Sequence, residues 1–227
     1  MFEEARPWQS HRSRRPLVAV GPGPALSTDL CLIGIAASLG GEAGNDHPEC
    51  VHPTLGAVAR GVYDHCGDET KAALLPLAPS LLDTACTGLD VSARLVATCV
   101  STALASPLPE RIDADRSRRL DAARRTALYL MSRGAGGGPA PGKDDEPRPA
   151  TRMWVHLLDP VRLTEPTYRR LVSPGAVAEA VLVTARASGD ARDERLSQLL
   201  RWCIDLTRRL ASDRQKGPRG KSVSRGD

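Results

Sequence analysis

Apolar residues recur at helical intervals along most of the chain. In the last apolar stretch they follow one another by three, one, three, three and four positions, in the order Leu196, Leu199, Leu200, Cys203, Leu206 and Leu210. Steps of three and four place side chains on one face of an α-helix. This stretch therefore predicts an amphipathic helix, which we expect Asp190 to cap.

Residues that start and stop helices divide the first half of the chain. Ser and Asp cap helices, Pro fits the first turn, and Gly favours the end. These rules predict a helix from Ser27 to Gly40, one from Pro53 to a stop at Gly67, and one capped by Asp68 that reaches Leu75. The predicted elements that follow are a short piece over 80–85, a helix capped by Asp90 that closes before Pro107, and a charged helix from Pro109 to about Arg133.

Residues 134–151 are rich in Gly, Pro and charge, which is typical of a linker. They separate an N-terminal helical domain, 25–133, from a C-terminal helical segment, 152–211. In the latter we expect a short apolar piece over 153–158, a short helix over 168–172 that ends before Pro174, and an apolar helix over 175–187. The apolar faces of the two groups are expected to pack against each other or against a second copy.

Composition supports the helical interpretation. The chain holds 30 Ala and 28 Leu against 4 Ile and 1 Phe. Ala and Leu favour helices, whereas strands favour β-branched and aromatic residues. We therefore predict an all-α fold with two helical groups, a Gly/Pro-rich linker and basic, disordered ends.

The positive charge lies at the two ends. The formal net charge is +4, and the arm at 1–24 and the tail at 212–227 carry it around a nearly neutral body. Basic tails add affinity for phosphates, so nucleic acid is an alternative partner. The candidate contacts are weak ones: Arg12, Arg14, Arg15, Arg214, Lys216, Arg219 and Lys221.

The six cysteines favour a reducing compartment. Four of them lie in apolar stretches (Cys31, Cys86, Cys99 and Cys203), where a free cysteine packs as a small apolar side chain. The pair Arg14-Arg15 resembles part of an export signal, but Gly21-Pro22 interrupts the apolar run that follows. We expect a bacterial cytoplasmic protein without a membrane span.

A group of His and Cys residues is a weak candidate for zinc. His47, Cys50, His52 and Cys66 fall within twenty positions, and His and Cys are the usual zinc ligands. His65 and Cys66 are neighbours on a predicted helix, so they point in different directions. An ordinary structural role for these side chains is the alternative, and we assign no metal.

No motif predicts catalysis. Asp64, His65 and Cys66 are residue types found in catalytic triads. Consecutive helical residues point about 100° apart, so these three side chains cannot line up as a triad. Residues 137–143 fit the G-x-x-x-x-G-K pattern, yet Asp144 stands where Ser or Thr would hold magnesium. We expect no catalytic residue, no cofactor and no enzymatic activity.

One segment carries a resemblance. Residues 46–53 have the pattern D-x-P-x-C-x-x-P at the start of a helix, and Tyr63-Asp64 and Asp68 follow. In these features the chain resembles a group of uncharacterised actinobacterial helical proteins, over roughly residues 30–105. In that group an Asn stands where this chain has Tyr63. The resemblance implies a structural role for Cys50 and no particular activity.

Together these observations predict a non-catalytic regulatory or accessory protein that acts through macromolecular contacts. Its expected partner is a protein or another copy of itself. One alternative is a DNA-binding transcription regulator that uses the basic ends. The other is a zinc-binding protein or an enzyme centred on residues 47–66.

Overall fold

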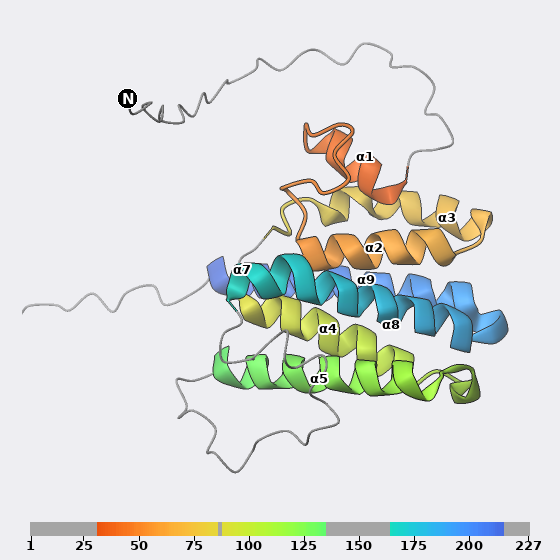
Figure 1. Cartoon of the computed structure of the whole chain (residues 1–227). Coiled ribbons are helices and arrows are strands. Elements are labelled where there is room, and N and C mark those ends of the chain that lie inside the picture. The colour runs from red at the N-terminus through yellow and green to blue at the C-terminus, as the bar shows by residue number, and fades with distance from the viewer. Residues whose placement is uncertain (1–30, 86–87, 135–163, 216–227) are drawn as a thin grey trace, which may run out of the picture.

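The computed structural model describes residues 31–85, 88–134 and 164–215, and in these ranges the chain is helical without any strand (Figure 1). The all-α prediction is confirmed. The α-helices are α1 (Leu32–Leu39), α2 (Pro53–His65), α3 (Asp68–Leu74), α4 (Leu89–Leu104), α5 (Ala114–Gly134), α7 (Glu165–Thr167), α8 (Ser173–Ala187) and α9 (Arg192–Gln215). Shorter helical turns are η1 (Leu75–Leu81), η2 (Pro109–Arg111), η5 (Tyr168–Val172) and η6 (Gly189–Ala191).

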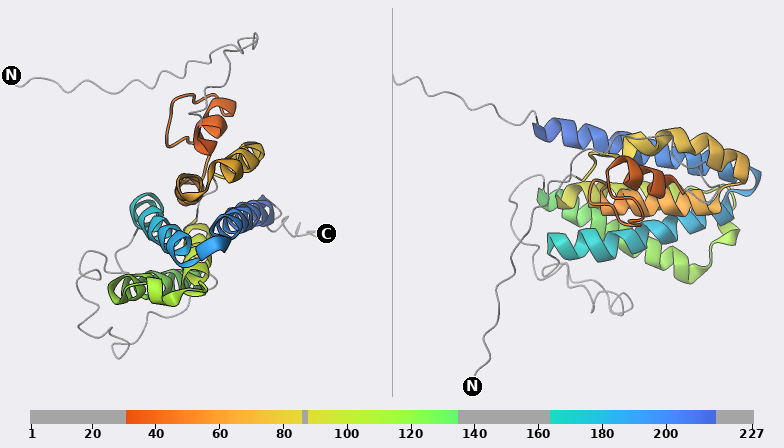
Figure 2. Two further views of the ribbon diagram at one scale, coloured as in Figure 1. Left: turned by 90° about the vertical axis from the view of Figure 1, so that its right-hand side faces the viewer. Right: turned by 90° about the horizontal axis from the view of Figure 1, so that it is seen from above.

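The long helices lie side by side in a layered bundle. Seen end-on, α1 lies at one side of the bundle and α5 at the opposite side (Figure 2). Helix α4 packs mainly on α5 and α8, while α2 packs on α8 and α9. Helix α1 covers η1 and α2. Helices from the beginning and from the end of the chain are therefore interleaved.

Both helical groups contribute to one core. Leu55 of α2 and Leu95 of α4 are fully buried, and they belong to the same apolar cluster as Val181 of α8 and Leu199 of α9. The predicted stripe on α9 is confirmed, because Leu196, Leu199, Leu200 and Cys203 are all fully buried. The apolar faces of the two groups thus pack against each other. The predicted linker lies outside the described residues, except for its first residue, Gly134.

Three predicted helix caps are wrong. Gly67 precedes α3 and Gly88 precedes α4 as the cap residues, so Asp68 and Asp90 lie in the first turns instead. Asp190 lies in η6, one turn before α9 begins. The charges of Asp68 and Asp90 still complement the positive ends of α3 and α4 from inside the first turn. Helix α3 begins one residue earlier, and α4 two residues earlier, than caps at Asp68 and Asp90 would place them.

The long charged helix starts later than predicted. Pro109 opens only the short turn η2, and α5 begins at Ala114. Asp113 provides the break, because its Oδ1 accepts the Arg116 N–H at 2.8 Å. This side-chain bond satisfies one of the amides that a helix leaves free at its start.

The chain continues through Pro174, where we predicted a helix end. Residues 168–172 form a widened π turn that leads directly into α8, with Pro174 in its first turn. A proline interrupts helical hydrogen bonding and crowds the carbonyl four residues earlier, and a π turn relieves both problems. The predicted piece over 80–85 is also wrong, since the helical turn η1 ends at Leu81.

Three further predictions concern the end of α1, two segments outside the described residues, and membrane spans. Helix α1 ends before Gly40 as predicted, whereas Ser27 and the piece at 153–158 lie outside the described residues. Among the described helices, none combines the length and the apolar character needed to cross a membrane.

Candidate functional site

Among the described residues, the four candidate zinc ligands do not come together as one group. His47 is exposed in the loop after α1, and His52 is fully buried at the start of α2. Cys66 follows the opposite end of this 13-residue helix, about 20 Å away at 1.5 Å per residue. Over the described ranges, no three His, Cys, Asp or Glu side chains form a group that could hold a metal ion.

His52 instead belongs to a buried polar network. Its Nδ1 accepts the backbone N–H of Thr54 at 3.2 Å, and its Nε2 lies 3.4 Å from the Ser92 hydroxyl. The Thr54 hydroxyl lies 3.3 Å from that of Ser92 and 2.7 Å from that of Ser173. All four residues are fully buried. The network therefore joins α2, α4 and α8 inside the core.

The geometry of this network rules out a Ser–His nucleophile. Because Nδ1 of His52 accepts a hydrogen bond, a neutral ring carries its proton on Nε2 and donates to Ser92. A general base would need a free lone pair on that nitrogen. Ser92 is also fully buried, so no substrate reaches it. We interpret the four side chains as mutual partners that satisfy one another's hydrogen-bonding groups in the core.

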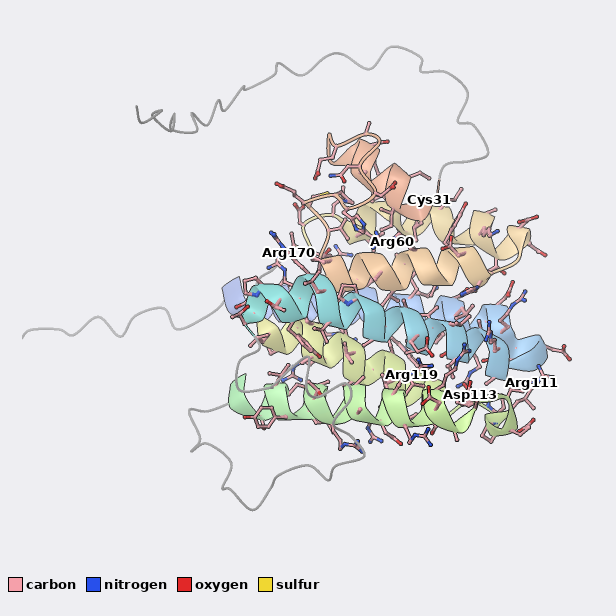
Figure 3. The ribbon with its side chains drawn as sticks, viewed as in Figure 1. Cys31, Arg60, Arg111, Asp113, Arg119 and Arg170 are labelled. Atoms are coloured by element: carbon pink, nitrogen blue, oxygen red, sulfur yellow. The ribbon has the colours of Figure 1, made fainter. Side chains whose placement is uncertain are left out.

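The loop between α1 and α2 is held by a carboxylate. Glu42 accepts the backbone N–H groups of Glu49 at 2.9 Å and Cys50 at 3.2 Å, and the Asn45 amide at 2.8 Å. The backbone N–H of Glu49, foremost, holds the pKa of Glu42 below its ordinary value. Arg60 of α2, labelled in Figure 3, donates to the Asp46 carbonyl at 2.7 Å. The backbone of Cys50 is thus held in the loop by its contact with Glu42.

Glu42→Gln is expected to remove a pH-dependent part of the stability. A carboxylate with a depressed pKa stabilises the fold above its unfolded value, near 4.5, and loses this effect as pH falls through the folded value. The difference in melting temperature between wild type and variant should therefore be largest near pH 7 and should narrow below about pH 4. Thermal melts followed by circular dichroism across this range measure it. A difference that stays constant with pH would contradict the role of the charge.

The buried cysteines are unsuited to chemistry. Cys99 of α4 and Cys203 of α9 are fully buried thiols whose sulfur atoms lie 3.7 Å apart. The hydrogen bond to Cys203 and the loss of solvent raise the pKa of Cys99. Burial raises the pKa of Cys66 to about 11. The Cys66 and Cys99 thiols therefore stay protonated near neutral pH, and the thiolate is the reactive form.

The outer face of α9 offers a different kind of site. We use this name for the exposed residues Gln198, Arg201, Trp202, Asp205, Arg208 and Arg209. Trp202 is 50% exposed, although it lies next to the fully buried Cys203. Further along α9, towards its C-terminal end, lies a shallow hollow of about 340 Å³. It is lined by Asp205, Arg208, Arg209, Ser212 and Asp213. Exposed Trp and Arg side chains are the residue types that most often dominate protein-binding energies.

This face of α9 was not predicted from the sequence. The apolar stripe of the helix already showed that position 202 falls on the polar side, where a Trp is out of place. That mismatch was the available signal. The nucleic-acid candidates receive no such support, because Arg12, Arg14, Arg15, Lys216, Arg219 and Lys221 lie outside the described residues and Arg214 belongs to the last turn of α9.

Comparisons of the chain with protein families, with curated proteins and with solved structures find no match. The resemblance of residues 46–53 to uncharacterised actinobacterial proteins stays a prediction.

Proposed function

We propose that the protein is a non-catalytic accessory or regulatory protein that binds a protein partner through the outer face of α9. The observation that carries this proposal is the half-exposed Trp202 among arginines. An indole exposed to water lacks the favourable free energy of burying its apolar surface. Contact with a partner protein would bury that surface. The neighbouring arginines supply hydrogen bonds at the edge of such a contact.

Two further features support a binding role over a catalytic one. His52 and Ser92, whose imidazole and hydroxyl groups lie within hydrogen-bond distance of each other, are both fully buried. The described cysteines are free thiols, which favours the reducing cytoplasm as the place of action. This location is part of the proposal.

The test compares Trp202→Ala with Leu128→Ala. Leu128 of α5 is 48% exposed and serves as the matched control, since both changes remove an exposed apolar side chain. Each should leave stability within about 0.5 kcal/mol of wild type. Chemical cross-linking in the source cells, followed by mass spectrometry, should recover a defined protein with wild type and Leu128→Ala. Trp202→Ala should weaken that complex at least about tenfold in a direct binding assay, as expected for a central Trp.

Two outcomes would contradict the proposal. One is a complex whose affinity does not change in Trp202→Ala. The other is the recovery of no protein at all, together with a gel shift of duplex DNA that weakens steeply with salt. The second outcome would favour the DNA-binding alternative.

A further inference from the structure

An open groove of about 600 Å³ lies at the end of the bundle where α2 and α8 end and α9 begins. Its apolar part consists of Leu182 and Ala185 of α8. Three arginines from three different elements line it as well: Arg111 of η2, Arg186 of α8 and Arg192 of α9. Figure 3 shows Arg111 at this end, beyond Asp113 and Arg119. The groove is far along the bundle from the buried network at the start of α2.

Two of the three guanidinium groups are available for a ligand. Arg192 is held by Asp193, with Nε and Oδ1 2.8 Å apart. Arg111 donates one long hydrogen bond of 3.4 Å to the Arg186 carbonyl, which leaves most of its N–H groups unused. Within the described residues, the Arg186 side chain has no ion pair. Asp190 also lines the groove and pairs with none of these arginines at salt-bridge distance.

On the surface where α8 meets α5, the arginines are paired with carboxylates. There Glu179 of α8 lies 3.3 Å from Arg116 and 3.4 Å from Arg119 of α5. Asp113 and Asp115 complete that arrangement as further partners of the two arginines. The groove keeps a net positive charge, because three arginines line it against the single carboxylate of Asp190. Like charges held close together repel one another, and a bound anion would relieve that repulsion.

Two carbonyls at the end of α8 accept hydrogen bonds from groups that do not line the groove. The last carbonyls of α8 already have donors, since Ala187 accepts the Leu108 N–H at 3.1 Å and Thr184 accepts the Ser188 hydroxyl. Gly189 adopts a φ of 55°, which lets the chain turn sharply from α8 towards α9. This turn brings Arg186 and Arg192 to the same groove.

We propose that the groove binds a small molecule that carries a phosphate monoester. The planar guanidinium forks of Arg111 and Arg186 match phosphate oxygens and can donate two hydrogen bonds each. Leu182 and Ala185 would contact the apolar part of the ligand. The volume of the groove lies within the range of small-molecule sites. This site is separate from the outer face of α9, so either assignment can fail alone.

The experiment titrates the full chain with phenyl phosphate, with inorganic phosphate and with benzoate at constant ionic strength, by isothermal calorimetry and by ¹⁵N NMR. Phenyl phosphate should bind most tightly, because it offers both the phosphate and an apolar group. Arg111→Gln and Arg186→Gln should each weaken it about tenfold, the effect of losing a charge-assisted hydrogen bond. Amide shifts should cluster at residues 182–192.

Two control variants separate a specific role of the groove arginines from a general effect of positive charge. Arg124→Gln removes an exposed arginine of α5 and should leave the affinity unchanged. Arg186→Lys keeps the charge without the fork and should give an intermediate affinity. Equal affinity in the Arg111 and Arg186 variants and in wild type would overturn the proposal. So would the absence of heat and of amide shifts with phenyl phosphate, or a duplex DNA that binds these arginines more tightly than phenyl phosphate does.

Discussion

Leu199→Ala is expected to lower the free energy of unfolding by about 3 kcal/mol, within the usual range for a buried leucine. Leu199 of α9 is fully buried in the cluster that also holds Leu55 of α2. Truncation removes apolar contacts and leaves a cavity that tightly packed helices refill only in part. Chemical denaturation followed by circular dichroism measures the change.

The same experiment distinguishes one core from two. Leu55→Ala, in the first helical group, should destabilise the same single transition by a similar amount. Leu171→Ala is the control, because this side chain is 73% exposed and its loss should cost almost nothing. Two separate transitions, each shifted by only one of the buried variants, would contradict a shared core.

Gly61→Leu is expected to destabilise the fold by about 2 kcal/mol, in the range for overpacking. Gly61 lies on α2 where it approaches α8, and a Cβ placed there would be 3.2 Å from Cγ1 of Val181. Leucine extends well beyond its Cβ, so the two helices would have to separate. The better helix propensity of leucine offsets only part of this cost, up to about 1 kcal/mol.

A second glycine provides the matched control for this prediction. Gly175 on α8 has open space around its Cβ position. Gly175→Ala should therefore stabilise the protein by about 0.5–1 kcal/mol, since alanine restricts the unfolded chain. Denaturation midpoints should move in opposite directions for the two variants. Equal stability of Gly61→Leu and wild type would show that α2 and α8 are not closely packed.

Much of the fold could be predicted because local rules determine it. The leucine spacing on α9 fixes its buried face, Pro53 is at the start of α2, and Gly40 follows the end of α1. These features depend on residues within one or two turns of each other. The π turn at 168–172 was missed because Pro174 normally indicates a helix end. Its tolerance depends on the packing of the surrounding helices, which no local pattern encodes.

The site residues could not be predicted because they meet only in the folded chain. Thr54 and Ser173, 119 positions apart, come within hydrogen-bond distance in the core. Nothing near His52 in the sequence indicates that its ring accepts a backbone N–H and faces Ser92. As a histidine, His52 was a candidate zinc ligand, whereas in the structure its side chain caps the start of α2. Likewise, the groove arginines come from three elements whose ends converge.

Helices from both groups enclose one core, with its polar network inside. Native-state hydrogen exchange on the full chain tests this shared core most directly. The slowest amides of α2 and α4 and those of α8 and α9 should exchange through one opening event, with the same free energy and the same denaturant dependence. Exchange of α8 and α9 through a separate, less costly opening, while α2 and α4 stay protected, would contradict the account.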